Sequence, residues 1–218
     1  PTLDGWRAIA ILGVMASHAG HSYSQAHGTE SVFDRIATGT HGVNLFFAIS
    51  GLLITSRLLE EWDSAGTISL KRFYIRRAFR ILPPALVYLS CLAVLGALGL
   101  LPVVREEFVA ATFFFRNYLP PILGQNGAGF FTSHYWSLGV EEHFYLFWPM
   151  IVLVLGTGNL MRACIAIALA SLMCRVWVVH SGSWLHAAYL VTPCRLDGLA
   201  LGGLLACGER HKQSWSHL

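Results

Sequence analysis

Long apolar runs separated by short polar turns dominate the chain, and their lengths predict several membrane-crossing helices. A helix that crosses a bilayer core needs roughly 20 mostly apolar residues. The runs that approach this length are residues 3–20, 42–59, 85–101, 143–155, 163–179 and 188–207. The apolar part of residues 106–119 is shorter, so we expect an interfacial or re-entrant helix there. The pattern predicts an all-α fold, a polytopic transmembrane helix bundle with about six to seven spans.

Residues 60–81 lie between the second and third runs and concentrate positive charge. The five basic residues at the end of this segment are Lys71, Arg72, Arg76, Arg77 and Arg80. They alternate with aromatic and aliphatic residues, as in an amphipathic segment at a membrane surface. An excess of Lys and Arg favours the cytoplasmic side. Because proline disrupts helical hydrogen bonding, we expect Pro83 and Pro84 to end this segment and to start the third span.

The composition agrees with a membrane location. Of the 218 residues, 55% are hydrophobic and 12% are charged, whereas soluble domains are about 45–50% apolar and about 25% charged. The net charge of +3 is modest, and the basic residues concentrate beside apolar segments, so we expect no nucleic-acid partner. The five cysteines lack CxxC spacing and are expected to pack between helices. The histidines lack a metal-binding pattern, so we predict no metal site.

The first run carries ionisable residues where lipid or packed helices should surround them. Arg7 and His18 are eleven residues apart, which is about 1,100° of helix rotation and leaves them within roughly 20° of each other. They therefore share a face and lie about 16 Å apart along the axis. An Arg at the bilayer centre costs about 2.5–3.5 kcal/mol even on insertion scales. We expect this face, with Asp4 near its start, to line a polar cavity.

Adjacent carboxylates mark the start of the fifth apolar segment. Glu141 and Glu142 lie about 100° apart on a helix, so one can approach an imidazole or a substrate while the other meets a cation. Tyr145 follows Glu141 by one turn and shares its face. A carboxylate beside an imidazole stabilises the imidazolium that forms when histidine acts as a general base. The pattern is therefore suited to proton removal from a hydroxyl group.

Each of these charges has a simpler structural explanation. An intramembrane Arg or Glu, such as Arg175, can pair with a neighbouring helix and stabilise the bundle. Arg195 and Asp197 could form a local ion pair at the polar start of the last helix. Gly198 and Gly202 have the GxxxG spacing, which favours helix packing over contact with a substrate.

Four stretches resemble the membrane-bound acyltransferase-3 family. They are Leu3–Ala8 with His18, Val43–Gly51, Phe73–Pro83 and Trp136–Tyr145. The resemblance implies a membrane-embedded acyltransferase domain over residues 1–218 in a bacterial cell membrane. Because the family fold has about ten helices, we expect the carboxy-terminal helices to be missing from this chain. The implied activity moves an acyl group, often acetyl from acetyl-CoA, to a hydroxyl of a carbohydrate or related acceptor.

The same resemblance implies roles for particular residues. Arg7 and His18 match the family's first motif, Arg77 and Arg80 its RxxR, and Ser137, Leu138 and Glu141 its SLxxE. The expected catalytic residues are His18 and Glu141, and the expected donor-binding residues are Arg7, Arg76, Arg77 and Arg80. The expected supporting residues are Asp4, Asn44, Ser50, Ser137, Glu142, Tyr145, Arg195 and Asp197.

The expected partners are acyl-CoA as donor substrate, a hydroxyl-bearing acceptor and membrane lipid, with no permanently bound cofactor. A multi-span transporter or an acyl or lipid carrier is the alternative, because buried charges can also form a translocation path. A membrane scaffold without chemistry would instead need these charges to be mutually paired. The basic segment beside an embedded Arg and His favours the enzyme.

Overall fold

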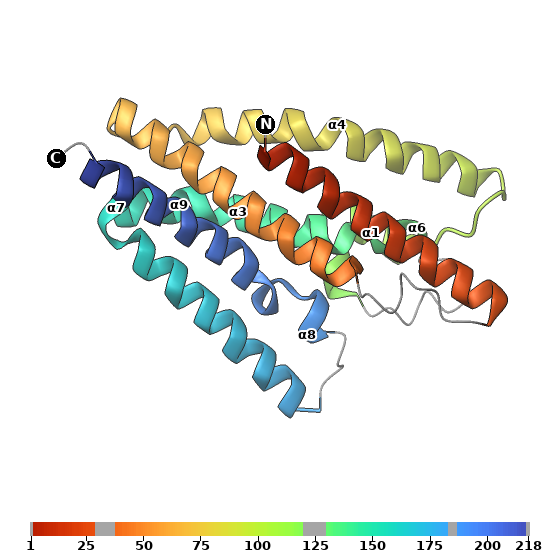
Figure 1. Cartoon of the computed structure of the whole chain (residues 1–218). Helices are drawn as coiled ribbons and strands as arrows, with labels where there is room; N and C mark the ends of the chain where they lie inside the picture. Colours follow the sequence, from red (N-terminus) through yellow and green to blue (C-terminus); the bar gives the residue numbers. More distant parts are fainter. Residues whose placement is uncertain (1, 29–37, 120–129, 183–186, 217–218) are drawn as a thin grey trace. The chain divides into compact units, whose positions relative to one another are not determined.

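The computed structural model describes residues 2–28, 38–119, 130–182 and 187–216, and every regular element in these ranges is helical (Figure 1). The all-α prediction is therefore confirmed for the part of the chain that is described. The chain forms two compact units. Residues 1–57 and 198–218 make the first unit, and residues 58–197 make the second.

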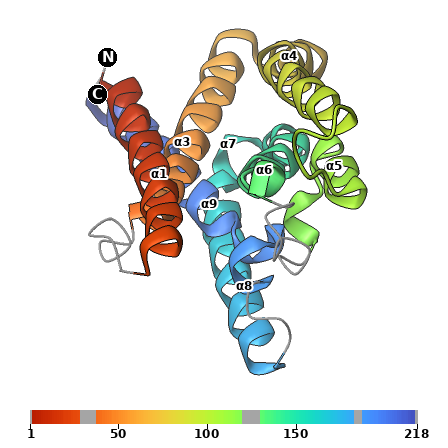
Figure 2. The same ribbon diagram turned by 90° about the vertical axis from the view of Figure 1, so that its right-hand side faces the viewer.

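Three helices build the first unit: α1 (Thr2–His27), α3 (Thr38–Ala65), which ends in the second unit, and α9 (Leu196–Ser216), which begins there. The elements can be followed in Figures 1 and 2. Helix α1 reaches α3 at Gly42, where an added Cβ would lie 2.6 Å from the Ala10 carbonyl oxygen. Glycine thus permits a close contact between the two backbones.

Helices α3 and α9 also pack backbone to backbone. A Cβ at Gly202 would collide with the carbonyl of Ala48, and one at Gly51 would collide with the carbonyl of Leu199. At Gly198 a Cβ would meet the Phe47 side chain at 3.1 Å. The GxxxG spacing of Gly198 and Gly202 therefore serves helix packing, as the sequence predicted.

The second unit contains the basic segment, and here the structure differs from the prediction made from the sequence. Residues 60–65 form the end of α3, and a short turn leads to α4 (Leu70–Ala97). Ser69 caps α4 by accepting a hydrogen bond from the Arg72 backbone N–H at 3.4 Å. Helix α4 continues through Pro83 and Pro84 without interruption, so the predicted break there is wrong. Transmembrane helices tolerate proline because neighbouring groups satisfy the freed carbonyls.

Residues 106–119 do not form a spanning helix, in agreement with the prediction. They are divided between α5 (Arg105–Thr112), which has eight residues, and the 3₁₀ turn η1 (Arg116–Tyr118). Eight helical residues extend only about 12 Å. The short helix α6 (Phe130–Ser133) precedes the main helix of this unit.

That main helix is α7 (Tyr135–His180), which has 46 residues and a sharp break at Gly156. Gly156 has φ 62° and ψ −178°, a conformation that is essentially restricted to glycine. The break divides α7 into two helices of similar length, which diverge from the kink in Figure 1. They contain the predicted spans at residues 143–155 and 163–179.

The predicted span at residues 188–207 is wrong. The structure divides it into α8 (Ala187–Leu190), the 3₁₀ turn η3 (Thr192–Cys194) and α9. Pro193 lies within η3 and lacks the backbone N–H that a continuous α-helix would use. This irregular segment packs against α7 and provides part of the cavity described below.

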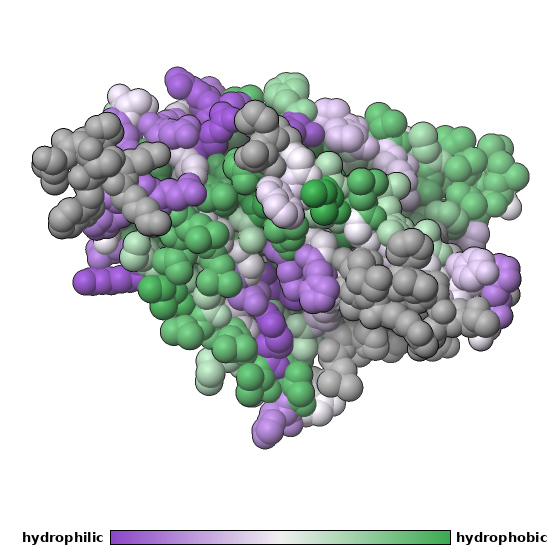
Figure 3. Space-filling view, viewed as in Figure 1, coloured by the Kyte–Doolittle hydropathy of each residue, from purple (hydrophilic) through white to green (hydrophobic). Residues whose placement is uncertain are grey.

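Three helices among the described residues are long and apolar enough to cross a membrane: residues 39–65, 70–97 and 131–180. The last includes both halves of α7 and has the length for two passes. Helix α1 is not among them, because its polar residues lower its hydropathy, so its predicted crossing stays a prediction. In Figure 3 the surface over the carboxyl-terminal half of α4 is hydrophobic, whereas that over the end of α3 and the first turns of α4 is hydrophilic. The chain is an integral membrane protein.

Candidate active site

Two of the predicted motifs meet in the second unit. The Arg77 guanidinium of α4 lies over the Tyr145 ring of α7, with Cζ 4.1 Å from the ring centroid. Glu141 and Glu142 lie close enough to Arg77 to act on its charge. A guanidinium over an aromatic face gains a cation–π attraction that strengthens when water is excluded. The basic segment and the carboxylate pair, far apart in the sequence, therefore form one cluster.

Burial distinguishes the members of this cluster. Glu141 is 5% exposed and Tyr145 is 4% exposed, whereas Glu142 and Arg77 are partly buried. A buried carboxylate needs a nearby cation or hydrogen-bond donor, because removing it from water is costly. Arg77 supplies positive charge beside both carboxylates. The cluster thus has the electrostatic character expected of a site that handles protons or anions.

Hydrogen bonds from α4 to α7 and within α7 hold the cluster in register. Tyr74 lies one turn before Arg77 on α4, and its hydroxyl donates to the Leu146 carbonyl at 2.7 Å. The Tyr135 hydroxyl donates to the Ala85 carbonyl at 3.2 Å, near the start of α7. The Ser137 hydroxyl donates to the His134 carbonyl at 3.2 Å. Ser137 thus uses its hydrogen in the first turn of α7, and its oxygen keeps only acceptor capacity.

The other predicted donor-binding residues of α4 are exposed. Arg76 pairs with Glu61 at 3.2 Å, and its side chain is 56% exposed. Arg80 is also exposed and lies near enough to Arg77 to repel its charge. Exposed guanidinium groups remain available to phosphate oxygens, which they bind through paired hydrogen bonds. Arg76 and Arg80 are therefore exposed, whereas Arg77 between them is partly buried against the Tyr145 ring.

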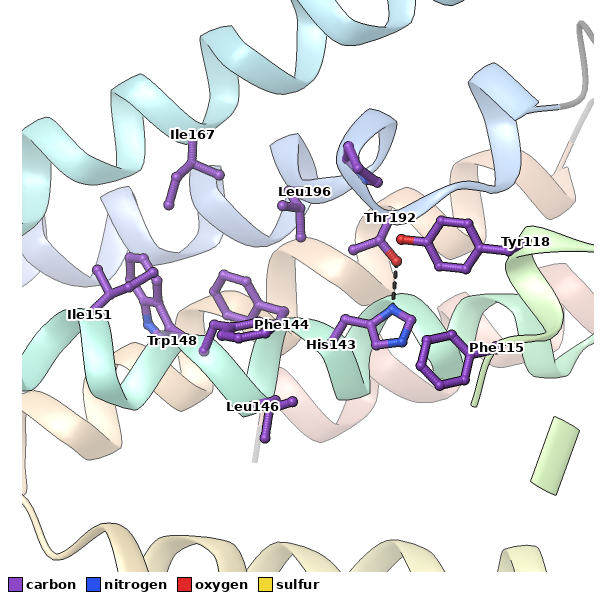
Figure 4. A pocket seen from close by; sticks show the side chains of 12 residues that line it. Phe115, Tyr118, His143, Phe144, Leu146, Trp148, Ile151, Ile167, Thr192 and Leu196 are labelled. Carbon is purple, nitrogen blue, oxygen red and sulfur yellow. Dashed lines mark hydrogen bonds between the residues drawn. The ribbon is translucent and has the colours of Figure 1, made fainter. Parts of the chain in front are cut away.

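An apolar cavity of about 580 Å³ opens beside the cluster, between the two halves of α7 and the turns η1 and η3. Figure 4 shows Phe144, Trp148 and Ile151 from the first half of α7, with Ile167 from the second half facing them. Trp148 stacks on Phe144 with ring centroids 4.9 Å apart. The space can accept an apolar group, and His143 provides a polar side chain in its lining.

Sequence reasoning did not identify the hydrogen-bonded group at this cavity. His143 Nδ1 lies 2.7 Å from the Thr192 hydroxyl, as the dashed line in Figure 4 marks. The Asn117 amide donates to the same hydroxyl at 2.9 Å. The hydroxyl can accept from Asn117 while it donates to His143 Nδ1, an arrangement that would leave the His143 proton on Nε2. This network ties three distant segments together.

A second network that the sequence did not predict connects η1 with α5 and α6. The Arg116 guanidinium pairs with Glu107 at 2.9 Å, and the Thr132 hydroxyl donates to the other Glu107 carboxylate oxygen at 3.1 Å. Burial lowers the pKa of Arg116, and the adjacent Glu107 carboxylate opposes that shift. The sequence signal for this ion pair was the presence of an Arg and a Glu in one short apolar stretch. Their pairing orders the segment that carries Asn117.

Asp197 pairs with a cation that the sequence did not single out as its partner. Its Oδ2 lies 2.6 Å from Nη2 of Arg175 of α7, and Asp197 is also close enough to Arg195 to act on its charge. The Arg195 guanidinium lies over the rings of Tyr189 and Trp136, at 4.8 Å and 5.7 Å from their centroids. Burial lowers the pKa of Arg195, and the nearby Tyr189 and Asp197 oppose the shift.

The remaining predicted residues belong to the first unit. Arg7 lies on α1 with its guanidinium 5.4 Å from the centroid of the Phe46 ring. His18 is exposed on the same helix, and Asn44 is exposed on α3, whereas Ser50 is 3% exposed. The side chain of Asp4 lies outside the described part of the structure. His18 and Glu141 are in different units, so their predicted partnership stays a prediction.

Comparisons with known proteins agree with the motifs. A family model described as an acyltransferase domain, that of the acyltransferase-3 family, matches residues 1–218. A candidate O-acetyltransferase of Staphylococcus aureus is 34% identical over 221 residues, which cover 94% of this chain and 34% of that protein. The peptidoglycan O-acetyltransferase OatA of Listeria monocytogenes is 32% identical over 165 residues, 71% of this chain and 24% of that protein.

A third relative, the O-acetyltransferase OatA of Staphylococcus aureus, is 30% identical over 221 residues, with 94% of this chain and 34% of that protein covered. No solved structure gives a significant match. The chain spans about a third of the length of the first of these curated relatives. Because the family model covers every residue, including the paired motifs of α4 and α7, the chain belongs to the acyltransferase-3 family of membrane proteins.

Proposed function

We propose that this chain is an integral membrane O-acyltransferase that moves an acyl group, in the first instance acetyl, from acyl-CoA to a hydroxyl of a carbohydrate acceptor. The family membership supports the reaction class. The relatives named as O-acetyltransferases support acetyl as the group moved. The relative named as a peptidoglycan O-acetyltransferase supports a carbohydrate acceptor.

The contact between Arg77 and Tyr145 carries this proposal. It joins the basic RxxR segment, Arg77 to Arg80, to the SLxxE segment that ends at Glu141. Arg76 and Arg80 would bind the phosphates of the donor at the exposed end of the cluster. Arg77 would hold the donor where the charge is partly buried and each hydrogen bond is stronger.

The chemistry requires a base, and His18 fits that role on the same face as Arg7. His18 would take the proton of the acceptor hydroxyl, directly or after carrying the acyl group itself. The hydroxyl oxygen would attack the thioester carbonyl, the C–S bond would break, and the CoA thiol would leave. Glu141 would stabilise the imidazolium. Arg7 would hold the donor at the other end of the helix face that it shares with His18. Asn44 or Ser50 would donate a hydrogen bond to the carbonyl oxygen, and Ser137 could do so only after giving up its hydrogen bond to the His134 carbonyl.

The test uses the full-length protein in detergent or membranes, with acetyl-CoA and the acetylated product measured by mass spectrometry. Arg77→Ala should raise the KM for acetyl-CoA by about 10- to 100-fold, because a charge-assisted contact is worth about 1.5–3 kcal/mol. Lys71→Ala, an exposed change in the first turn of the same helix, should leave the KM unaltered. His18→Ala should abolish transfer while acetyl-CoA binding and membrane insertion persist.

The carrier alternative makes a different prediction for the same variants. A carrier would not need to bind acetyl-CoA through Arg77 and Arg80, and no acylated product would form. If the protein binds no acetyl-CoA even at high donor concentration, the proposal is overturned in favour of transport. Near-normal product formation by the His18→Ala variant would overturn the assignment of His18 alone.

A further inference from the structure

Two cysteines from distant parts of the second unit meet at the base of η3. The Cys194 thiol donates a hydrogen bond to the Cys174 sulfur, with the two Sγ atoms 3.4 Å apart. Cys174 belongs to the second half of α7 and is partly buried, whereas Cys194 ends η3 and is 0% exposed. Val178 and Ala188 pack in the same cluster. The two sulfurs thus face each other within an apolar cluster that leaves Cys174 partly accessible.

We propose that Cys174 and Cys194 form a disulfide that links η3 to α7 in the protein as it occurs in the cell. A disulfide bond length is about 2.0 Å, so the sulfur atoms need to approach by only about 1.4 Å. The backbone beside Cys194 is already held to α7. Arg175 donates to the Cys194 carbonyl through Nε and Nη2 at 3.2 and 2.8 Å.

The oxidation needs an electron acceptor, and the disulfide of a thiol oxidoreductase of the cell envelope has the required chemistry. The Cys174 thiolate would attack that disulfide, which releases one acceptor thiol and leaves a mixed disulfide. Cys194 would then lose its proton and attack the Cys174 sulfur, which expels the second acceptor thiol. Two cysteine S–H bonds are lost, one Sγ–Sγ bond forms, and the acceptor gains two electrons and two protons.

Exposure determines the order of these steps. Cys174 is the more accessible thiol, so it reacts first with an external partner. Burial raises the pKa of Cys194 to about 12, and the hydrogen bond with Cys174 acts in the same direction. A thiol in that state is a poor nucleophile toward an external disulfide. Cys194 reacts only when the mixed disulfide on the Cys174 sulfur lies directly beside it. The basic start of α4 and Arg162 at the kink of α7 are expected on the cytoplasmic side. The turn after α7 is therefore expected on the outer face, where disulfides persist.

The link would affect the cavity as well as stability. Cys194 lies two residues after Thr192, whose hydroxyl contacts both His143 and Asn117. A covalent bond at Cys194 would restrict the movement of η3 relative to α7. It would therefore preserve the position of Thr192 at the cavity wall.

Peptide mapping of the full-length protein, acid-quenched in cells and alkylated without reductant, tests the proposal. Trypsin cuts after Arg162, Arg175 and Arg195, so Cys174 and Cys194 fall in separate peptides. Cys164 shares a peptide with Cys174, so the assay uses a Cys164→Ser background. We expect one cross-linked peptide pair, which disappears when reductant is added before alkylation. Complete alkylation of both cysteines in the quenched sample would overturn the proposal.

Thermal unfolding gives a second, independent measurement. Reductant should lower the unfolding midpoint of the unaltered protein but leave that of Cys174→Ala/Cys194→Ala unchanged. Cys91→Ala, a change at an exposed cysteine, should retain the full response to reductant. An equal midpoint with and without reductant for the unaltered protein would contradict the proposed link.

Discussion

Arg116 and Glu107 form an ion pair that is almost cut off from water, with side chains 5% and 1% exposed. The carboxylate also accepts from Thr132, so both of its oxygens have partners. Removing one member of such a pair leaves the other as an uncompensated buried charge. The same segment carries Asn117, which is hydrogen-bonded to Thr192 at the cavity. The pair therefore stabilises the fold and positions a wall of the cavity.

Arg116→Met should lower the free energy of unfolding by about 3–5 kcal/mol, because Glu107 loses its charged partner. Denaturant or thermal unfolding of the full-length protein in detergent measures this loss. Arg76→Ala is the matched control, because it breaks an ion pair whose Arg side chain is 56% exposed and should cost only about 0–1 kcal/mol. Similar losses in both variants would show that burial does not control the strength of these pairs.

Particular side chains show how far sequence reasoning reached toward the candidate site. Local spacing correctly put Glu141 and Tyr145 on one face of a helix, and both are buried together. Spacing could not identify Arg77 as the cation over Tyr145, because that contact depends on how α4 packs against α7. It also could not identify Arg175 as a partner of Asp197, since Arg175 approaches from a different helix.

Glycine determines the contact between α3 and α9. Gly202 faces the backbone of Ala48 so closely that even a methyl group has no room. Gly208 lies further along α9, and a Cβ there would meet nothing within 4 Å. The two glycines therefore have opposite roles in one helix: the first permits packing, and the second only weakens helix propensity.

Gly202→Ala should lower the free energy of unfolding by about 1–3 kcal/mol, because the added methyl group forces α9 away from α3. Gly208→Ala should instead be neutral or stabilise by up to about 1 kcal/mol, since alanine is the better helix former. Unfolding of both variants of the full-length protein under the same conditions measures the difference. A tolerated Gly202→Ala change would mean that the two helices do not pack this closely.

Helix boundaries were less predictable than helix existence. The sequence indicated apolar helices near every described long helix, because apolar length is a local property. It placed a break at Pro83 and Pro84, where α4 is continuous, and it predicted one span across residues 188–207, where η3 interrupts the helix. Neighbouring groups decide whether a proline breaks a helix, and these groups are not local in sequence.

Positive charge at the turns suggests the orientation of the second unit in the membrane. Lys71 and Arg72 open α4, and Arg162 follows the kink of α7. The positive-inside rule puts both regions on the cytoplasmic side. The end of α7 then lies on the outer side, because its second half has the length to cross.

Cysteine labelling in cells tests this orientation in a variant of the full-length protein whose native cysteines are replaced by alanine. Ser64 and Ser181 are both exposed, one before α4 and the other after α7. A membrane-impermeant maleimide should label Ser181→Cys in intact cells, and it should label Ser64→Cys only after the membrane is opened. Labelling in the reverse order would invert the orientation, and labelling of both in intact cells would reject two-sided topology.

The sequence by itself determined that this is a helical membrane protein of the acyltransferase-3 family, because hydrophobic length and short motifs are read locally. It also determined which helix faces carry Arg7 with His18 and Glu141 with Tyr145, because helix geometry follows from spacing alone. Only the tertiary structure decided which cation lies on Tyr145, which residue pairs with Asp197, and that Thr192 joins Asn117 to His143. Those choices depend on packing between segments far apart in the chain, where the cost of burying an unpaired polar group selects the partner.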